Sequence, residues 1–196
     1  MKTAKFRATS ARLSKGFTFI ELLIVLAVVA ILAVIGIPSI QSTIISGKVE
    51  PTANDLRIGI ASMRKNFNTG SAPYATLGTG AASTAVFANM IRGPGSTLTV
   101  AGTGNASTVQ HTIGAAGAQV TVASDTLASA GDSFSITVPN ANVATCPDLP
   151  AMMARTSDRI TVNGTVVKAI NGNYDSSAAA NACTSGDTNT FVFTVR

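Results

Sequence analysis

A continuous apolar stretch runs from Phe17 to Ile37 and contains a single charged residue, Glu21. About 21 residues at about 1.5 Å each give a helix of about 31 Å, close to the thickness of a bilayer's hydrocarbon core. A carboxylate at that depth costs about 2.5 to 3.5 kcal/mol on insertion scales, so an acid kept there indicates a function. We therefore predict a membrane-spanning helix over residues 17–37 in which Glu21 has a role of its own.

Beyond the span, a helical pattern continues with two interruptions. Pro38 lacks an amide hydrogen and clashes with the preceding turn, and Gly36 weakens the same stretch, so we expect a kink there. The alternative is that Pro38 marks the end of a helix. Pro51 is a second possible bend.

An amphipathic part of the same long helix is predicted over residues 52–67. Its apolar residues recur at spacings of three and four, whereas charged residues lie on other faces. The apolar stripe consists of Ala53, Leu56, Ile60, Met63 and Phe67. We expect this stripe to pack against a sheet of the same chain rather than against a membrane surface or a partner's groove.

The segment from Asn68 to Gly95 is rich in Gly, Ala, Ser and Thr, which predicts loops. A short helix is predicted around residues 83–91. The Gly93-Pro94-Gly95 cluster should end this segment, because glycine and proline interrupt regular structure.

From Thr97 onward the pattern changes to a period of two, which predicts strands. Asn163-Gly164 lies between two of the runs and is a strong signal for a tight hairpin turn. The fold class is therefore α+β: a long N-terminal helix, transmembrane in its first part, packed on an antiparallel sheet. The predicted strands cover residues 97–100, 109–113, 119–123, 134–138, 160–162, 165–170 and 191–195.

The net positive charge of the chain is concentrated in its first 16 residues. These residues contain five cations and no acid, which places them on the cytoplasmic side of the membrane. The cations are Lys2, Lys5, Arg7, Arg12 and Lys15. Without them the chain has nine cationic and nine acidic side chains, so the basic sequence pI of 9.6 gives no reason to expect a nucleic-acid-binding surface.

An ordinary secretory signal peptide also has a basic start and an apolar middle. The apolar run here is longer than the usual 7 to 15 residues, no A-x-A-like site clearly ends it, and a signal peptide has no use for Glu21. A second alternative is a single-pass anchor for an unrelated periplasmic domain.

The N-terminal quarter resembles the type IV pilins and the related pseudopilins of type II secretion. The resemblance rests on Gly16 before Phe17, then Thr18, Glu21, the Leu22-Leu23-Ile24-Val25 run and Pro38. It implies that a prepilin peptidase cuts between Gly16 and Phe17 and methylates the new amine of Phe17. It also implies that the region of Gly36 and Pro38 can extend during assembly.

Cleavage would create a positive amine one helical turn from Glu21. In the family this carboxylate is thought to meet the Phe17 amine of a neighbouring subunit, which fixes the stagger of subunits in the filament. An unpaired acid in a helix bundle is costly and a paired one selects a register. We therefore expect Glu21 to act in assembly through charge pairing.

Cys146 and Cys183 are the only cysteines, and both lie in the part placed outside the cytoplasm, where disulfides persist. We expect them to pair, which would stabilise the fold by about 3 to 4 kcal/mol. The alternative of a redox or metal pair has little support, because the spacing is not C-x-x-C and His111 is the only imidazole. In pilins the bridged C-terminal loop is commonly exposed and carries subunit contacts or adhesive specificity.

The C-terminal half, with Phe134 to Pro139, Cys146-Pro147-Asp148-Leu149 and Val162-Asn163-Gly164, looks like that of the type IVb pilins. Phe17 after the cut is more usual in type IVa pilins, so the subclass stays open. We expect no enzyme, because one histidine and no clustered acids leave no acid–base constellation. No cofactor, metal or direct nucleic-acid site is expected either.

Taken together, the sequence predicts a structural subunit of a type IV pilus. Residues 1–16 form the removed leader, 17–67 the long helix and 68–196 the globular head. The partners are copies of itself, prepilin peptidase, the membrane before assembly and the inner-membrane pilus assembly machinery. The precursor lies in the inner membrane with its head in the periplasm, and the assembled subunit lies in an extracellular pilus used for adhesion or motility. The alternatives are a secretion pseudopilin, a minor pilin and, further off, a monomeric anchored binding module.

Overall fold

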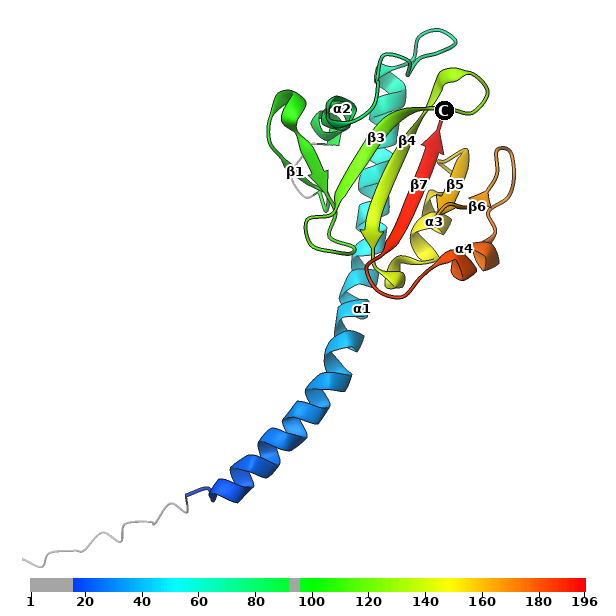
Figure 1. Cartoon of the computed structure of the whole chain (residues 1–196). Coiled ribbons are helices and arrows are strands. Elements are labelled where there is room, and N and C mark those ends of the chain that lie inside the picture. The colour runs from blue at the N-terminus through cyan, green and yellow to red at the C-terminus, as the bar shows by residue number, and fades with distance from the viewer. Residues whose placement is uncertain (1–15, 92–95) are drawn as a thin grey trace, which may run out of the picture. The chain divides into compact units, whose positions relative to one another are not determined.

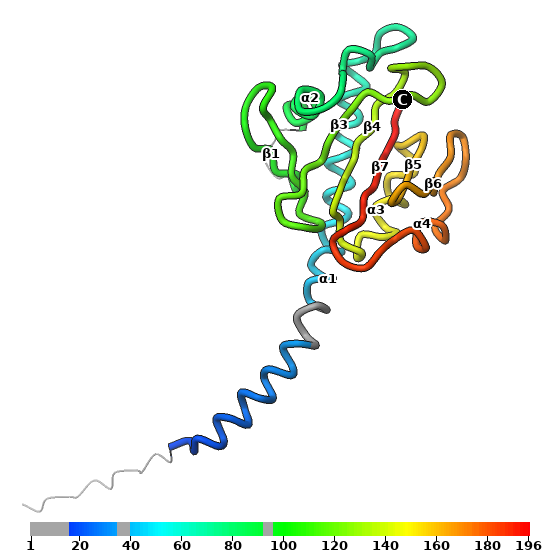
Figure 2. Tube along the Cα trace, in the orientation of Figure 1, coloured from blue at the N-terminus to red at the C-terminus, as the bar shows by residue number. Residues whose placement is uncertain are grey.

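The computed structural model describes residues 16–91 and 96–196, with the backbone alone for residues 35–39. Figures 1 and 2 show a long helix followed by a head of smaller helices around a sheet. The helices are α1 (Phe19–Asn66), α2 (Ala81–Ile91), α3 (Asp148–Met153) and α4 (Ser176–Ala182), with two 3-10 turns, η1 (Gly104–Ala106) and η2 (Val143–Thr145). The strands are β1 (Thr99–Ala101), β2 (Thr108–Gln110), β3 (Gln119–Thr126), β4 (Ala130–Ala141), β5 (Arg159–Val162), β6 (Thr165–Lys168) and β7 (Asn189–Val195).

The seven strands form one sheet in the order β1-β2-β3-β4-β7-β5-β6, and every neighbouring pair is antiparallel. β7, the last strand in the sequence, lies between β4 and β5. The predicted α+β class and all seven predicted strands are confirmed. The largest boundary errors are at β2, which ends at Gln110 instead of residue 113, and at β4, which is longer than expected at both ends.

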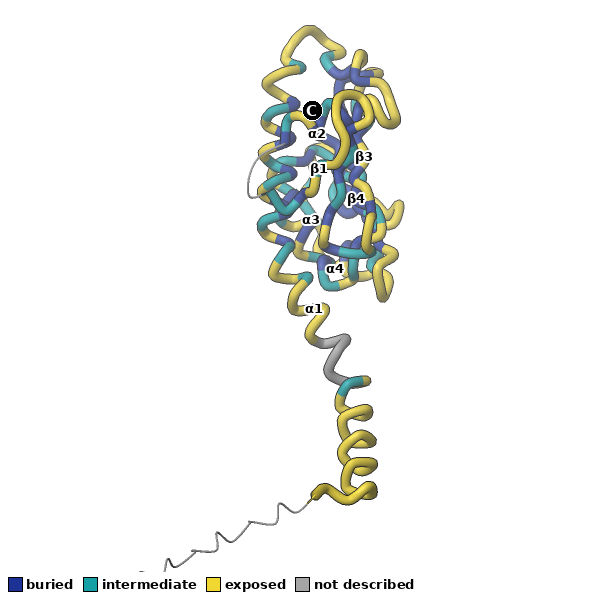
Figure 3. Tube along the Cα trace, turned by 90° about the vertical axis from the view of Figure 1, so that its left-hand side faces the viewer, coloured by how far each residue is buried: buried dark blue, intermediate teal, exposed yellow. Residues whose placement is uncertain are grey.

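Contacts divide the chain into two units, one ending at Ser39 and the other covering residues 40–196. The core of the second unit lies between the sheet and the part of α1 that belongs to that unit (Figures 1 and 3). Register brings side chains of three neighbouring strands together on the inner face, where Val122 is opposite Ile136 and Ile136 is opposite Phe193. All three side chains are buried because alternate residues of a strand face the same side.

The predicted helical stripe is confirmed. Leu56, Ile60 and Met63 are fully buried in the core beneath the sheet, together with Ala53. Phe67 is partly buried and its ring packs against Tyr74 at a centroid distance of 5.7 Å.

A close contact between α1 and α2 depends on a missing side chain. A Cβ atom at Gly59 would lie 2.4 Å from the Phe87 ring and 2.8 Å from Ile91. The glycine therefore lets α2 lie directly on α1, although glycine weakens a helix by about 1 kcal/mol relative to alanine.

Polar side chains on the other faces of α1 attach it to the head. The carboxylate of Asp55 accepts hydrogen bonds from the Thr97 amide at 2.6 Å and the Thr97 hydroxyl at 2.7 Å, next to the start of β1. Arg57 donates to the carbonyl of Met152 at the end of α3. The helix is thus attached both to the segment before β1 and to α3 by charged side chains that lie outside its apolar stripe.

The Asn163-Gly164 turn joins β5 and β6 as predicted. Its two residues have φ angles of 49° and 82°, and two successive positive values are the signature of a type I′ hairpin turn. The Asn163 side chain also donates to the carbonyl of Ala182 and accepts from the Thr190 amide, so the turn is tied to β7.

The amphipathic part predicted over residues 52–67 forms the last third of α1, and Pro51 does not end the helix. The predicted helix around residues 83–91 is confirmed as α2. The expected kink at Gly36 and Pro38 falls on residues whose side chains lie outside the described part, and it stays a prediction. The same holds for the leader, residues 1–15, and for Gly93-Pro94-Gly95.

Within the described residues, none of the helices combines the length and the apolar character needed to cross a membrane. The expected span, residues 17–37, extends into the stretch 35–39 that is described by backbone alone.

Candidate assembly site

The residues around the expected cleavage site form the start of α1. Thr18 precedes the first helical residue, its carbonyl accepts from the Leu22 amide, and its hydroxyl accepts from the Glu21 amide at 3.3 Å. This is the N-cap arrangement, in which a threonine satisfies an amide of the first helical turn. Sequence reasoning missed this role of Thr18, although Thr-x-x-Glu is the signature of a capping box.

Glu21 lies in the first turn of α1 and is exposed. Its carboxylate makes no hydrogen bond or ion pair with the residues that the structure describes. The amide ends of the first turn carry a partial positive charge, which favours an acid at this position. The exposed carboxylate therefore has no cationic partner among the described residues.

Large apolar side chains cover α1 on all sides in this region. Phe17 is 80% exposed and Leu26 is 55% exposed. No part of the described chain covers them. The exposed residues are Phe17, Phe19, Ile20, Leu22, Leu23, Ile24, Val25, Leu26, Val28, Val29, Ile31, Leu32 and Val34.

Gly16 has an open environment. A Cβ atom placed on it would meet nothing within 4 Å. The described part of the chain therefore makes no demand for glycine at position 16.

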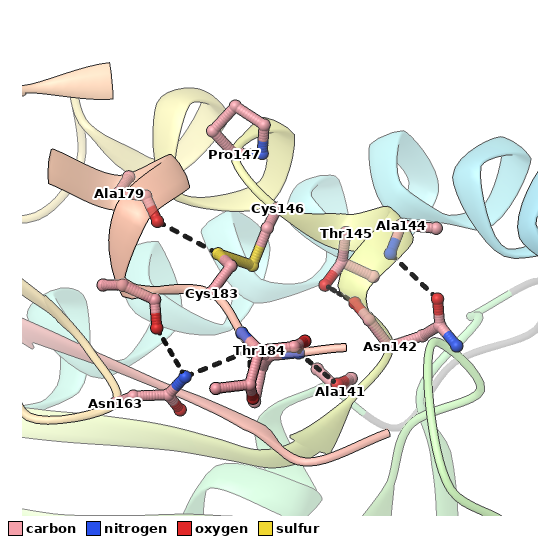
Figure 4. Close-up of a disulfide and its surroundings, with 12 residues drawn as sticks. Ala141, Asn142, Ala144, Thr145, Cys146, Pro147, Asn163, Ala179, Cys183 and Thr184 are labelled. Atoms are coloured by element: carbon pink, nitrogen blue, oxygen red, sulfur yellow. Dashed lines mark hydrogen bonds between the residues drawn. A yellow bond between two sulfur atoms is a disulfide. The ribbon is translucent and has the colours of Figure 1, made fainter. Parts of the chain in front are cut away.

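The structure confirms the predicted disulfide between Cys146 and Cys183, which are 37 residues apart (Figure 4). The closed segment contains α3, β5, β6 and α4. Cys146 follows η2, whose preceding residue Asn142 accepts a hydrogen bond from the Ala144 amide at 2.8 Å. Cys183 directly follows α4, whose first turn is capped by the Asp175 carboxylate.

Asn189 shapes the loop that follows the disulfide, residues 184–188. Its side chain is fully buried, accepts from the Thr184 amide at 2.7 Å and donates to the Thr184 carbonyl at 2.8 Å. The side-chain amide of Asn189 also donates to the Ala141 carbonyl, and the backbone amide of Val143 donates to the Gly186 carbonyl. Sequence reasoning assigned nothing to Asn189, because a single asparagine at the start of a strand gives no signal.

His111 lies inside the head and is only 3% exposed. One ring nitrogen, Nε2, lies 2.7 Å from the Pro139 carbonyl oxygen, and burial lowers the pKa of the ring below its ordinary value. Burial thus disfavours the charged form of the ring. Among the residues described, no group of three potential metal ligands comes together.

Comparison with known families decides the identity. Residues 49–196, about three quarters of the chain, match the family described as PilS N terminal. The chain is a type IV pilin of the PilS family. Residues 11–37 of the pilin match the prokaryotic N-terminal methylation motif, which spans Gly16, Phe17 and Glu21. No curated protein matches the sequence.

The fold resembles that of one solved pilin structure, and two further structures match less well. The pilin matches the type IV b pilin of Salmonella typhi with a TM-score of 0.54 and 23% identity, covering 72% of this chain and 95% of that one. TcpA, a type IV pilin of Vibrio cholerae El Tor, gives a TM-score of 0.48 and 14% identity over 76% and 99% of the two chains. The NMR structure of the Salmonella typhi type IVb pilin PilS gives 0.41 and 22% over 72% and 94%.

The pilin is a structural subunit of a type IV pilus, and pilins are structural proteins rather than enzymes. Its family implies an extracellular pilus after assembly and self-association. The methylation motif implies a membrane-anchored precursor and a substrate of prepilin peptidase.

Proposed function

We propose that the pilin polymerises through residues 17–37 after cleavage between Gly16 and Phe17, with Glu21 of one copy paired to the methylated Phe17 amine of the next. The observation that carries this proposal is the exposed apolar surface of α1. An apolar helix with no cover in its own chain needs a bilayer before assembly and a bundle of identical helices afterwards. In both surroundings Glu21 is the one position where charge must be matched.

The pairing acts on register. The apolar side chains of residues 19–34 give many similar ways to place two such helices side by side, because they resemble each other in size and polarity. A carboxylate that must meet an amine selects one axial stagger, since every other stagger leaves a buried charge unpaired. The contact repeats from copy to copy and does not close, which generates a helical filament rather than a ring.

The experiment compares Glu21→Ala with the matched control Glu50→Ala, an exposed acid on the same helix beyond the apolar stretch. Cells are sheared, and the pilin is quantified in fibres and in the inner membrane. We expect Glu21→Ala to remain in the membrane and to leave the fibres, because insertion needs only apolar length. Wild-type fibre yield for Glu21→Ala would contradict the proposed role.

A second experiment tests processing. Mass spectrometry of wild-type fibres should find Phe17 as the N-terminal residue, carrying one methyl group. Gly16→Val should accumulate as uncleaved precursor. Because a side chain at residue 16 meets no described atom, loss of cleavage reports on the peptidase and not on the fold of the substrate. Fibres that contain residues 1–16 would refute the cleavage site.

A further inference from the structure

A pocket of 270 Å³ lies where α1 ends, and its lining combines cations with aromatic rings. Arg64 and Arg196 supply two guanidinium groups, and Phe67 and Tyr74 supply the rings. The rest of the wall is the loop that leaves α1: Asn68, Thr69, Gly70 and Pro73. Such a pocket fits a small, acidic, solvated segment rather than an apolar one.

The two arginines differ in how they are held. The Arg64 side chain is held by hydrogen bonds within its own chain, because it donates to the Arg196 carbonyl at 2.7 Å and to the Thr156 carbonyl at 3.2 Å. Asp158 accepts from the Arg196 amide at 2.8 Å and lies 4.0 Å from Arg64. The guanidinium of Arg196 has no partner among the described residues, so the pocket has one arginine that supports it and one that is free to bind.

The opposite end of the head carries an exposed acidic loop. Residues 184–188 are all exposed and have small side chains, and Asp187 lies near the end of the loop. One oxygen of Asp187 accepts from the Asn142 amide at 2.5 Å, and the other has no described partner. Asn189 holds the loop from beneath, so little conformational freedom is lost when the loop binds.

β7 connects the two features. Asp187 lies two residues before its first residue and Arg196 directly after its last, so the acid and the free guanidinium lie at opposite ends of one strand. At about 3.3 Å per residue, the nine steps between them span about 30 Å. Figure 1 shows this arrangement, with the chain end marked C at one end of the sheet and α4, which leads into the loop, at the other.

We propose that loop 184–188 of one pilin docks in the Arg64–Arg196 pocket of a second copy, with the Asp187 carboxylate on the Arg196 guanidinium. The opposite charges lie at opposite ends of one head. A second copy shifted along the direction of β7 therefore brings its Asp187 to the Arg196 of the first, and the same contact repeats in the next copy. The inference rests on the proposed function, because it supplies the heads of a filament with a contact separate from that of the N-terminal helices.

The test is a charge exchange in the full-length pilin, measured as fibre mass recovered after shearing. Arg196→Glu and Asp187→Arg should each reduce recovery by about fivefold, as expected for the loss of about 1 kcal/mol per contact. The double variant Asp187→Arg with Arg196→Glu should recover wild-type yield, because the pair is restored in reverse. Single variants that match the wild type, or a double variant no better than the singles, would overturn the proposal.

Matched controls locate the effect. Asp148→Arg combined with Arg196→Glu should not recover yield, because Asp148 is exposed but lies outside the loop. Lys65→Glu should leave yield close to wild type, because Lys65 is exposed at the end of α1 and does not line the pocket. An intact Cys146–Cys183 disulfide and an unchanged amount of pilin in the membrane show that each variant folds.

Cross-linking gives a second readout and separates the two proposals. Carbodiimide joins amines to carboxylates, so Arg196→Lys fibres should yield linked dimers in which residue 196 is joined to Asp187. The added change Asp187→Asn should abolish this link. If Glu21→Ala removes fibres but Arg196→Lys fibres contain no link to Asp187, the role of Glu21 stands and only the proposed head contact fails. If the wild type forms no fibres, or if an acidic peptide from another protein is what occupies the pocket, the proposed copy-to-copy contact is refuted.

Discussion

Two stretches of the same helix α1 carry apolar side chains in opposite surroundings. Between residues 19 and 34 nearly every apolar side chain is exposed, and Leu26 is 55% exposed. Between residues 49 and 63 the apolar side chains of one face are buried, and Leu56 is fully buried. The difference lies in what covers them: the second stretch packs on a sheet of its own chain, whereas no part of the described chain covers the first.

This contrast separates stability from assembly. Burial of an apolar side chain in its own chain contributes to the free energy of unfolding of the head. Burial against a bilayer or a second copy contributes only when that partner is present. The same substitution, made in the two stretches, should therefore change two different measurements.

The largest effect is expected for Leu56→Ala compared with Leu26→Ala. Leu56→Ala removes a fully buried side chain and should lower the free energy of unfolding of the head by about 2 to 5 kcal/mol. Leu26→Ala should change it by less than about 0.5 kcal/mol. Chemical denaturation in detergent, followed by near-ultraviolet circular dichroism, measures both. Equal losses would show that the two stretches share one folding unit.

The disulfide should act on one side of the comparison only. Replacing both cysteines, Cys146→Ser with Cys183→Ser, removes the covalent link between two positions that are 37 residues apart. The free energy of unfolding of the head should fall by about 3 to 4 kcal/mol. The helix of residues 19–34 should be unaffected, because it lies outside the closed segment. Hydrogen exchange resolves the two regions, and faster exchange in residues 19–34 would argue against this separation.

Two glycines of α1 allow covered and uncovered positions of the helix to be compared by the addition of a single Cβ atom. Gly59→Ala places a Cβ 2.4 Å from the Phe87 ring and should cost about 1 to 3 kcal/mol as α2 is displaced. Gly47→Ala meets nothing within 4 Å and should stabilise the helix by up to about 1 kcal/mol. Thermal unfolding of the two variants gives the signs. A stabilising Gly59→Ala would mean that α2 does not lie directly on α1.

The smallest effect is expected from one turn of the head. The amides of Leu127, Ala128 and Ser129 bond the Asp132 carboxylate and lower its pKa from 3.8 to about 2. Below pH 3.8 the unfolded chain binds the proton first, so this stabilisation is present above that pH and is lost as the pH falls toward 2. Asp132→Asn should flatten the pH dependence of the unfolding free energy between about pH 4 and 2. An unchanged slope would rule out this carboxylate as its source.

The sequence predicted most elements with a strong period. The spacing of Leu56, Ile60 and Met63 predicted their burial, and the Asn163-Gly164 pair predicted the hairpin turn. Both signals can be read from the local sequence alone. α4 was missed, although Asp175 is a good N-cap and alanines follow it. Seven residues are too short for the hydrophobic period to be read.

The candidate site divides in the same way. Gly16, Phe17 and Glu21 stand out because a charge and a cleavage pattern interrupt an apolar run. Asn189 and Arg196 could not be found, because their significance comes from partners 5 to 132 residues away in the chain. The loop before β7 and the packing of α1 on the sheet bring those partners together.

The position of β7 has a consequence for the order of folding. β7 is the last of the described strands in the sequence, and it lies between β4 and β5. Strands β1 to β4 and strands β5 and β6 therefore remain two separate pieces of sheet until residues 189–195 insert between them. The core of the head is thus closed by the strand that comes last in the sequence.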